Sequence, residues 1–600
     1  MKLLMIHAKH MEYKCRERTE FAEEDIPLNA SVDNALVCFV SVEREDDEYS
    51  AVLGAEEIMK IARDINPSKI LIYPYAHLST KLAGPDIALE VLKELENRIR
   101  GRGLDTIRAP FGWYKEFTLE CWGHPLSEAF REIRPIRRRE EVVSEIKSKF
   151  VILTPDGREI GLEDYKKVGD DSLIKFIEAE VLGKAPAREP PSVEGMKKHA
   201  LIDYETASDA GHFRFYPKGA LIFNLIKEWA DSIARRLNAI EVFTPLIYDW
   251  SFKDIREQAE SFHERHYLVY PPDMRKEYVL RFAGDFGLFR MMKDAIISYK
   301  QLPLRIYEFT QSFRYERRGE LAALRRLRAF HMPDIHSFSA TIKDGWEEYK
   351  EIYRVLSDAV EDMGIEYAIA FRIVKDFYKK YREEILSLIK YSGKPALIEI
   401  LSSRKHYWAV KHEFQGIDSV GNNCQLCTVQ LDVEDAERYG IMYVDKDGKK
   451  KGCIICHVSV GSIERWIYQV LEEAYKMEKP SFPFWLAPTQ LRIIPVGEEY
   501  IEECIELATA LTNTCRVDVD DREMSVAKKV REAEKEWVPL IIVYGERERK
   551  SGIFNIRVRG KGEEKMSMDE LMAKISSYMD DKPFIKLSLP ILLSKRINFR

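Results

Sequence analysis

The chain has 600 residues, of which 45% are hydrophobic and 32% are charged, and this length predicts several domains instead of one core. A formal net charge of -7 excludes bulk basic character as the basis of any nucleic-acid binding, so such a surface would have to be local. No apolar run reaches the roughly 18 residues of a membrane helix, so we expect a cytoplasmic protein without a membrane partner.

The first part of the chain alternates strand and helix patterns. "LLMI", "ALVCFVSVE" and "KILIYPYAHL" are typical of strands, whereas "AEEIMKIARDI" and "ALEVLKELENRI" have helical spacing. This predicts a compact α/β domain over residues 1–143. The basic run from Arg134 to Arg139 is interpreted as a solvated stretch in preference to a phosphate contact. A linker is expected over residues 144–195, because "KAPAREPPSVEG" marks a boundary.

Two further domains are expected. Residues 196–487 are aromatic-rich, and they open with helical spacing in "LIFNLIKEWADSIARRLNA" before several short apolar strands. Residues 488–600 alternate strand and helix patterns again, which predicts a small α/β sheet domain.

A charged run in the middle domain, "SFRYERRGEL", has the composition of an anion site. The planar guanidinium group of arginine binds phosphate groups well through paired hydrogen bonds. The chain has neither a GxxxxGK[ST] loop nor a GxGxxG turn, which are the common phosphate-binding loops. Arginines and Mg²⁺ would therefore have to hold any nucleotide. After a turn at Gly319, "RRLRAF" brings more arginines and Phe330 back beside the first strand, and such an aromatic side chain can stack a base.

Four cysteines form two CxxC pairs, Cys424/Cys427 and Cys453/Cys456. Such pairs can bind zinc with four thiolates. Both pairs lie in strand-like segments without turn residues, so strand alternation points Cys453 and Cys456 to opposite faces. We favour packed thiols over a four-cysteine zinc site.

The motifs of the middle domain resemble those of a known family. "FRYE" with "RRLRAF" resembles motif 2 of class II aminoacyl-tRNA synthetases, "IEVFTPLIYD" resembles motif 1, and "GSIERWIYQVLE" resembles motif 3. "HMPDIHSF" and "CTVQLDVEDAERYG" are similar to archaeal-type threonyl-tRNA synthetases. "YPYAHLS", "PFGWYKEF" and "GHPLSE" resemble the editing domain of that family, which is related to D-aminoacyl-tRNA deacylases. "VPLIIVYGERERKSGIFNIRVR" resembles its anticodon-binding domain.

The resemblance implies a multidomain α/β and α+β protein. Its parts are a deacylase-like α/β editing domain, a class II catalytic domain built on an antiparallel sheet, and an α/β anticodon-binding domain. The implied activity is ATP-dependent ligation of L-threonine to tRNA(Thr) through threonyl-adenylate, with hydrolysis of mischarged seryl-tRNA and a homodimer formed through the catalytic domain. Two alternatives stay open: an editing-only deacylase with an inactive synthetase domain, and a non-catalytic tRNA-binding protein.

The resemblance also assigns roles in the synthetase site. Arg314 would hold the ATP α-phosphate, Glu316 would read the adenine amino group and Phe330 would stack the adenine. Arg326 and Arg465 would hold the γ-phosphate end, with Mg²⁺. The residues expected to contact threonine are Asp334, Thr428 and Gln430.

The family binds the amino and hydroxyl groups of threonine with zinc, and His336 and His457 match its two histidine ligands. The third ligand is a cysteine in most of the family, and the matching position here is Asp285. A carboxylate is a legitimate zinc ligand, so we expect one zinc per subunit on these three residues. A broken site is the other interpretation. Zinc cannot reject serine, and a missing methyl group is worth only about 1–3 kcal/mol, so an editing step is needed.

The editing pocket of the family matches His77, Tyr114, Lys115 and Glu128. Lys115 would supply a cation near the developing oxyanion, and Glu128 would orient Lys115 or His77. In the tail, Glu548 and Arg557 match positions at which the family reads anticodon bases.

Overall fold

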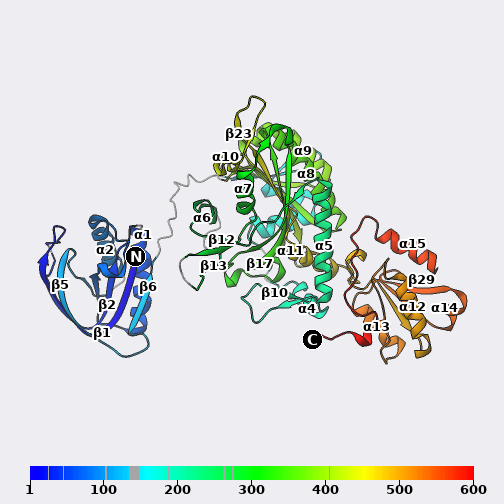
Figure 1. Cartoon of the computed structure of the whole chain (residues 1–600), viewed down its shortest axis with the longest axis horizontal. Coiled ribbons are helices and arrows are strands. Elements are labelled where there is room, and N and C mark those ends of the chain that lie inside the picture. The colour runs from blue at the N-terminus through cyan, green and yellow to red at the C-terminus, as the bar shows by residue number, and fades with distance from the viewer. Residues whose placement is uncertain are drawn as a thin grey trace. The chain divides into compact units, whose positions relative to one another are not determined.

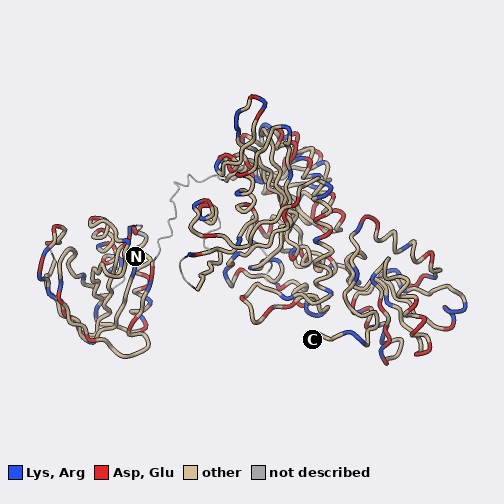
Figure 2. The backbone as a smooth tube through the Cα atoms, in the orientation of Figure 1, with Lys and Arg blue, Asp and Glu red and all other residues tan. Residues whose placement is uncertain are grey.

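A computed structural model describes residues 1–600 except 25, 45, 102–103, 134–147, 185, 187, 261–264, 273–275, 405 and 600. The chain divides into two compact units, Met1–Ser144 and Glu145–Arg600 (Figure 1). The basic run from Arg134 to Arg139 lies outside the described residues. Both signs of charge are distributed along the elements of the two units (Figure 2). None of the helices in the described ranges combines the length and apolar character that a bilayer crossing requires.

Over its described residues, the first unit is one sheet with two α-helices on a single face. Its strands follow the order β4-β3-β2-β1-β5, and β6 also pairs with β1. The helices α1 and α2 bury one face of the sheet through Ile58 and Leu95, while aromatic residues gather on the other face. The expected α/β domain is therefore confirmed. Its elements are β1 (Lys2–Arg18), β2 (Asn29–Ser41), α1 (Glu48–Ile65), β3 (Lys69–Pro74), α2 (Pro85–Arg100), β4 (Thr106–Arg108), β5 (Trp113–Cys121) and β6 (Glu128–Glu132).

The second unit contains a ten-stranded sheet, with the order β11-β16-β17-β24-β21-β20-β18-β19-β7-β8. Most neighbouring strands are antiparallel, as expected for the catalytic domain; β11/β16 and β18/β19 are parallel. The strands are β7 (Ser148–Leu153), β8 (Glu159–Gly161), β11 (Ile240–Glu241), β16 (Leu304–Phe313), β17 (Ala329–Ser339), β18 (Tyr367–Val374), β19 (Ala396–Leu401), β20 (Trp408–Ile417), β21 (Asn423–Asp432) and β24 (Ile454–Ser459).

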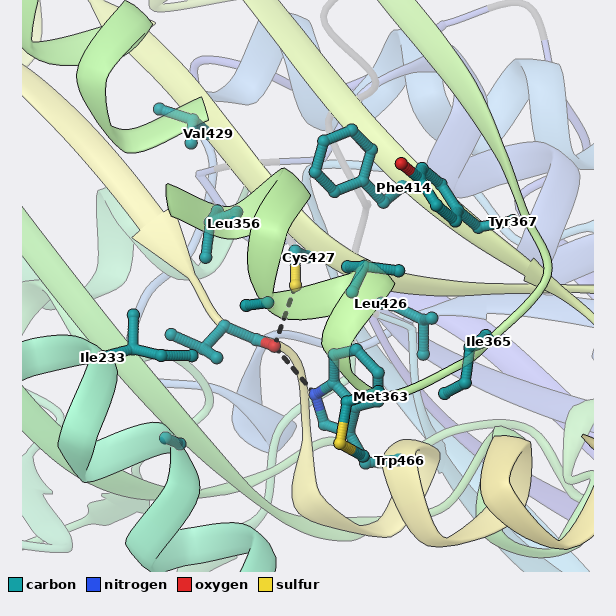
Figure 3. Close-up of a cluster of buried hydrophobic side chains, with 14 of the residues drawn as sticks. Ile233, Leu356, Met363, Ile365, Tyr367, Phe414, Leu426, Cys427, Val429 and Trp466 are labelled. Carbon is teal, nitrogen blue, oxygen red and sulfur yellow. Dashed lines mark hydrogen bonds between the residues drawn. The ribbon is translucent and has the colours of Figure 1, made fainter. Parts of the chain in front are cut away.

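Long helices bury one face of this sheet and leave the other face for the site. The buried side chains include Trp229 of α5, Leu356 of α8 and Trp466 of α11. Figure 3 shows part of this core, in which Cys427 and the indole nitrogen of Trp466 both donate to the carbonyl of Val460. The helices of this layer and its neighbours are α5 (Pro217–Arg236), α8 (Ile342–Asp362), α9 (Lys375–Ser392) and α11 (Ile463–Lys476).

Much of the segment that we expected to be a linker is folded. The strand β7 pairs with β19 and β8 pairs with β7, so residues from Ser148 onward extend the catalytic sheet. Tyr165 and Phe176 pack in a buried cluster with Leu397. The continuous apolar run "FVIL" explains this outcome, because Val151 and Leu153 pack into one buried cluster and Ile152 packs into another, so both faces of the strand are covered. The helices here are α3 (Asp171–Phe176) and α4 (Ser192–Lys198).

Shorter elements surround the catalytic sheet. They are β9 (Ile202–Tyr204), β10 (Phe213–Phe215), β12 (Ile247–Asp249), α6 (Lys253–Glu260), β13 (Leu268–Val269), β14 (Tyr278–Leu280), α7 (Asp285–Asp294), β15 (Ile297–Ser298), α10 (Asp435–Tyr439), β22 (Met442–Val444) and β23 (Lys450–Gly452).

The C-terminal part has its own sheet, with the order β26-β25-β27-β28-β29. Its core is separate from that of the catalytic sheet, which fits the expected small α/β domain. Its elements are β25 (Leu491–Pro495), α12 (Ile501–Leu511), β26 (Val517–Val519), α13 (Val526–Lys535), β27 (Leu540–Tyr544), α14 (Glu546–Ser551), β28 (Ile553–Val558), β29 (Gly562–Ser567) and α15 (Met568–Tyr578).

Candidate active site

A cleft of about 860 Å³ lies over the open face of the catalytic sheet. Every residue that the resemblance places in the synthetase site lines it. These residues are Asp285, Arg314, Glu316, Arg326, Phe330, Asp334, His336, Thr428, Gln430, His457 and Arg465.

Strand register explains why residues so far apart in sequence meet. His336 of β17 lies opposite His457 of β24, and His457 lies opposite Gln430 of β21. A second row lies two residues away from the first on each strand, and it consists of Asp334, Ser459 and Thr428. Because side chains two residues apart share a face of a sheet, both rows point into the cleft.

Two of the three candidate phosphate arginines, Arg314 and Arg465, lie at one end of this face. Arg314 Nε donates to the Phe282 carbonyl at 3.0 Å, and its guanidinium lies 5.1 Å from the centroid of the Phe330 ring. Arg465 Nε donates to the Arg325 carbonyl at 3.1 Å. Burial and the nearby Arg465 lower the pKa of Arg314 to about 10. Two cations held close together in this way favour a bound anion.

The structure pairs two side chains to which the resemblance gives separate roles. Glu316 Oε2 accepts from Arg326 Nη2 at 2.9 Å and from Arg326 Nε at 3.1 Å. Arg265 lies 3.5 Å from the same carboxylate oxygen, and Arg326 also pairs with Glu320. In the roles that the resemblance gives them, Arg326 would have to leave Glu316 to hold a phosphate, whereas Glu316 has a second carboxylate oxygen with which to accept from a base.

Asp334 and Gln430 form the floor of the cleft. Asp334 Oδ2 accepts from the Thr310 hydroxyl at 3.0 Å, and Gln430 Oε1 accepts from the Tyr407 hydroxyl at 2.9 Å. Burial and the nearby carboxylate of Asp285 raise the pKa of Asp334 to about 7. Thr428 Oγ1 donates to the His412 carbonyl at 2.7 Å, which fixes its orientation.

Three residues near this floor meet as a possible metal-binding set. Asp285 is the first residue of α7, and its Oδ1 lies 3.1 Å from His336 Nε2 and 3.9 Å from His457 Nδ1. One ligand atom from each residue lies within 4.8 Å of the others. Two imidazole nitrogens and one carboxylate oxygen at the edge of an open cleft fit zinc with a free position for a substrate.

The electrostatics of the set favour a cation. Burial opposes the charged form of Asp285, but the hydrogen bond with His336 and the nearby ring of His457 outweigh it and hold the Asp285 pKa well below its ordinary value. Burial also opposes protonation of His457, but Asp285 and Asp432 outweigh it and raise the His457 pKa to about 10. The same carboxylates that stabilise an imidazolium would stabilise a metal ion.

The CxxC cysteines stay outside this set. Cys424, Cys427, Cys453 and Cys456 are free and buried, and in the described ranges no candidate metal group includes a cysteine. Cys427 donates to the Val460 carbonyl and Cys456 to that of Gly345, both at 3.2 Å. The four thiols are packed, which agrees with the interpretation favoured from the strand pattern.

In the first unit, Lys115 lies beside an aromatic cluster. Its Nζ donates to the carbonyls of Pro110 at 2.7 Å and Trp113 at 3.1 Å, and it lies 5.2 Å from the centroid of the Tyr73 ring. Burial lowers the pKa of Lys115 to about 8. His77 is exposed and its ring lies 5.2 Å from that of Tyr75, whose ring neighbours that of Tyr73. Lys115 and His77 therefore lie at the edge of the same cluster of aromatic side chains.

Tyr114 and Glu128 are placed differently. Tyr114 follows the opposite side of β5 from Lys115 and is 66% exposed. Glu128 pairs with Ile6 of β1, whereas Lys115 pairs with Cys15, and nine residues of a strand span about 30 Å. The expectation that Glu128 orients Lys115 is not supported within one chain, because β5 and β6 pair with opposite ends of β1.

Strand alternation could also have identified cleft residues that sequence reasoning missed. Lys411 of β20 lines the cleft and pairs with Glu413 at 2.6 Å, two residues along the same strand. Tyr407 and Arg265 also line it, but they lie in irregular segments that carry no such signal. Arg325, the first arginine of "RRLRAF", lines the cleft as well.

The two residues that we expect to contact the anticodon, Glu548 and Arg557, have different structural surroundings. Glu548 Oε2 accepts from the Gly545 amide at 3.1 Å and so caps α14. Arg557 of β28 pairs with Glu534 at 3.0 Å and Glu563 at 3.2 Å. Arg557 also lines a second cavity of about 680 Å³, whereas Glu548 does not.

Three family models match successive parts of the chain. Residues 1–133 match the archaea-specific editing domain of threonyl-tRNA synthetase, 267–474 match the class II tRNA synthetase core domain (G, H, P, S and T), and 490–578 match an anticodon binding domain.

Relatives match over the full length. Proteins named threonine–tRNA ligase from Pyrococcus horikoshii and Methanocaldococcus jannaschii are each 39% identical, and each alignment covers 100% of both chains. Among solved structures, the RNA binding domain of threonyl-tRNA synthetase from Cryptosporidium parvum is 22% identical with a TM-score of 0.57, covering 64% of this chain and 98% of that one. Prolyl-tRNA synthetase from the same organism is 18% identical with a TM-score of 0.52, covering 64% and 74%. These structures show similarity of fold.

Proposed function

The chain belongs to the threonine–tRNA ligase family, and from this premise we propose which step of the reaction each group of residues performs. It is a class II aminoacyl-tRNA synthetase with an N-terminal editing domain, and its substrates are ATP, threonine and tRNA. The observation that carries the residue assignment is the shared cleft, in which all the synthetase candidates meet. The editing-only alternative is not favoured, because a domain without synthetase activity has no need of this set.

We assign adenylate formation to the arginine end of the cleft. Arg314 would hold the α-phosphate, Phe330 would stack the adenine, and Glu316 would accept from its amino group. Arg465, together with Arg326 once it leaves Glu316, would hold the γ-phosphate end, with Mg²⁺ on the phosphates. Fixed guanidinium groups stabilise the charge that develops on the phosphoryl oxygens, because they need no reorientation during the reaction.

We assign threonine recognition to the floor of the cleft. Asp334, Thr428 and Gln430 would surround the amino acid, and Asp285, His336 and His457 would hold one zinc per subunit. When bound, zinc supplies a Lewis acid for the amino and hydroxyl groups of threonine, which valine cannot match. The residues present fit the ion through their donor types and spacing.

We assign editing to the Lys115 side of the first unit. The ammonium of Lys115 would stabilise the oxyanion that forms when water attacks the ester of seryl-tRNA, with His77 at the edge of the same aromatic cluster. Tyr114 would contact the tRNA from its exposed position. Glu128 keeps a role only if that role does not require contact with Lys115.

We further propose a homodimer formed through the catalytic domain. Phe243 is 75% exposed and Ile296 is 92% exposed, and their chain neighbours Val242 and Ile297 belong to one buried cluster. Ile240 lies exposed on β11, which ends the sheet. Exposed apolar residues grouped beside an edge strand are typical of a protein interface.

The remaining assignments concern the domain boundaries, the anticodon and the compartment. We propose an editing domain at 1–143, a catalytic domain that includes β7 and β8 in addition to the expected residues 196–487, and an anticodon-binding domain at 488–600, so that the segment 144–195 is only partly a linker. Arg557 and Glu548 would act on the anticodon loop. Nine free cysteines fit a reducing cytoplasm.

Two assays on the full-length protein test the proposal. Threonine-dependent exchange of pyrophosphate into ATP reports on the synthetase cleft, and release of serine from seryl-tRNA reports on the first unit. We expect both activities. Deacylation without exchange would instead support the editing-only alternative, and absence of both would support a non-catalytic tRNA-binding protein.

A further inference from the structure

Asp432 lies behind the candidate metal-binding set, and the proposed function gives it no role. It is the last residue of β21 and is 1% exposed. Its Oδ1 accepts from the amides of Glu434 at 2.8 Å and Asp435 at 2.9 Å. Its Oδ2 lies 2.8 Å from His457 Nε2. Both oxygens of this carboxylate are engaged, so its orientation is fixed by the backbone that follows the strand.

This contact decides which nitrogen of His457 is available to a ligand. A carboxylate beside Nε2 favours the form in which Nε2 carries the proton and donates it. In neutral imidazole the lone pair is then on Nδ1, which is the atom that faces Asp285 Oδ1. Metal-binding histidines commonly donate their second nitrogen to a carboxylate in this manner.

We propose that Asp432 is a positioning residue that holds His457 with its Nδ1 lone pair directed at the cation shared with Asp285 and His336. The inference rests on the zinc site proposed above and deepens it. Asp432 does not line the cleft, so it acts through His457 and not on the substrate.

A competing arrangement uses the same histidine. Asp432, Asp435 and His457 also lie within metal-binding distance of one another, and all three are buried. Asp435 Oδ1 accepts no hydrogen bond, and Arg438 Nη1 lies 3.8 Å from it. A cation here would have to displace the proton between Asp432 and His457 Nε2. That step removes the 2.8 Å hydrogen bond, whereas a cation at Nδ1 keeps it, so we favour the latter position.

The experiment compares Asp432→Asn with Asp435→Asn in the full-length protein. Asparagine keeps the size of the side chain, and Asp435 is a matched control because it is also a buried carboxylate near His457 without a hydrogen bond to that ring. Zinc content is measured after dialysis, and zinc affinity is measured by competition with a chromophoric chelator. The visible spectrum of the Co²⁺-loaded protein reports on the ligand set. Binding of ATP to the same samples reports on folding of the cleft.

We expect one zinc per chain in the parent protein, and a loss of affinity of about 10–100-fold in Asp432→Asn with an altered Co²⁺ spectrum. Asp435→Asn should keep the affinity and the spectrum of the parent. In a protein that already carries His457→Ala, adding Asp432→Asn should cause no further loss, because the effect passes through that ring.

Three outcomes would overturn the inference. If the parent binds zinc and Asp432→Asn binds it with the same affinity, Asp432 has no positioning role, and the proposed zinc site is unaffected. Two metals per chain, with one lost in Asp435→Asn, would place a cation in the competing set. A parent protein that binds no zinc under loading would remove the zinc site and the inference together.

Discussion

Asp285 Oδ1 lies 3.1 Å from His336 Nε2, which joins the first turn of α7 to the middle of β17. The resemblance gives this aspartate a position where most of the family has cysteine. The contact shows that the carboxylate still reaches the histidine with which the thiolate would share a metal. In the zinc site proposed above, Asp285 would therefore supply an oxygen ligand in place of the sulfur of cysteine, with both histidines nearby.

The identity of the ligand at position 285 should control zinc affinity. Asp285→Cys should bind zinc more tightly than the parent, because thiolate is a softer and stronger ligand for this ion. Asp285→Ala and His336→Ala should each lose metal, since only two ligands remain. Chelator competition and metal analysis measure both effects. A metal-free parent that still activates threonine would contradict the zinc assignment.

Arg314 should be necessary for adenylate formation and dispensable for editing. Arg314→Ala should slow threonine-dependent pyrophosphate exchange by roughly 10²–10³-fold, the usual cost of removing one fixed donor from a developing charge. Deacylation of seryl-tRNA should persist, because Lys115 lies in a separate compact unit. Arg317→Ala is the matched control, since Arg317 is an exposed arginine of the same loop that does not line the cleft. Equal loss in both variants would mean that the loop, not this guanidinium, matters.

Lys115 should be necessary for deacylation. Lys115→Met should lower the rate by roughly 10²–10³-fold while threonine activation persists. Lys14→Met, which alters an exposed lysine on the neighbouring strand β1, should have no effect. Unchanged deacylation in Lys115→Met would exclude the proposed role.

The pH dependence of deacylation should follow the same residue. Burial lowers the pKa of Lys115 to about 8, so the ammonium is present below that pH and is lost above it. Enzymatic deacylation should therefore fall as the pH rises through about 8, after subtraction of enzyme-free hydrolysis. Lys115→Arg should remain charged to higher pH, and any residual activity should not fall in that range. A parent rate that stays constant from pH 7 to about 9 would contradict the role of the charged form.

Arg557 should affect tRNA charging and not amino-acid activation. Arg557→Ala should weaken aminoacylation by about 1–3 kcal/mol in kcat/KM if the guanidinium reads a base edge. Glu548→Ala should also weaken it, partly through the lost cap of α14. Arg549→Ala, an exposed arginine on α14 paired with Glu503, is the control. Parallel losses in pyrophosphate exchange would argue against an anticodon role.

The proposed dimer should depend on the exposed apolar residues beside β11. Phe243→Asp should shift the protein from dimer to monomer in sedimentation or light scattering, because a charge would be buried without a partner. Met477→Asp replaces an exposed apolar residue elsewhere on the same unit and should leave the mass unchanged. A parent protein that is monomeric at micromolar concentration would remove the proposal.

The sequence alone determined the classes of the domains. The alternation of apolar residues identified the strands and helices of both α/β domains, because side-chain periodicity is a local property. The resemblance of "FRYE", "RRLRAF" and "GSIERWIYQVLE" to class II synthetase motifs indicated the synthetase cleft, since each motif lies within one or two elements. The segment 144–195 was harder, because its prolines indicated a linker while its short strands depend on a distant partner, β19.

Only the tertiary structure decided which of the candidate residues meet. His336 and His457 are far apart in the chain, and they face each other because β17 and β24 are neighbours in the sheet. Glu316 and Arg326 pair across the loop, and Asp432 reaches His457 because β21 lies on the other side of β24. In the first unit, Glu128 and Lys115 stand close in sequence yet pair with opposite ends of β1. Alternation within one strand indicates which side chains share a face, but the order of the strands depends on contacts between segments that lie far apart in the sequence.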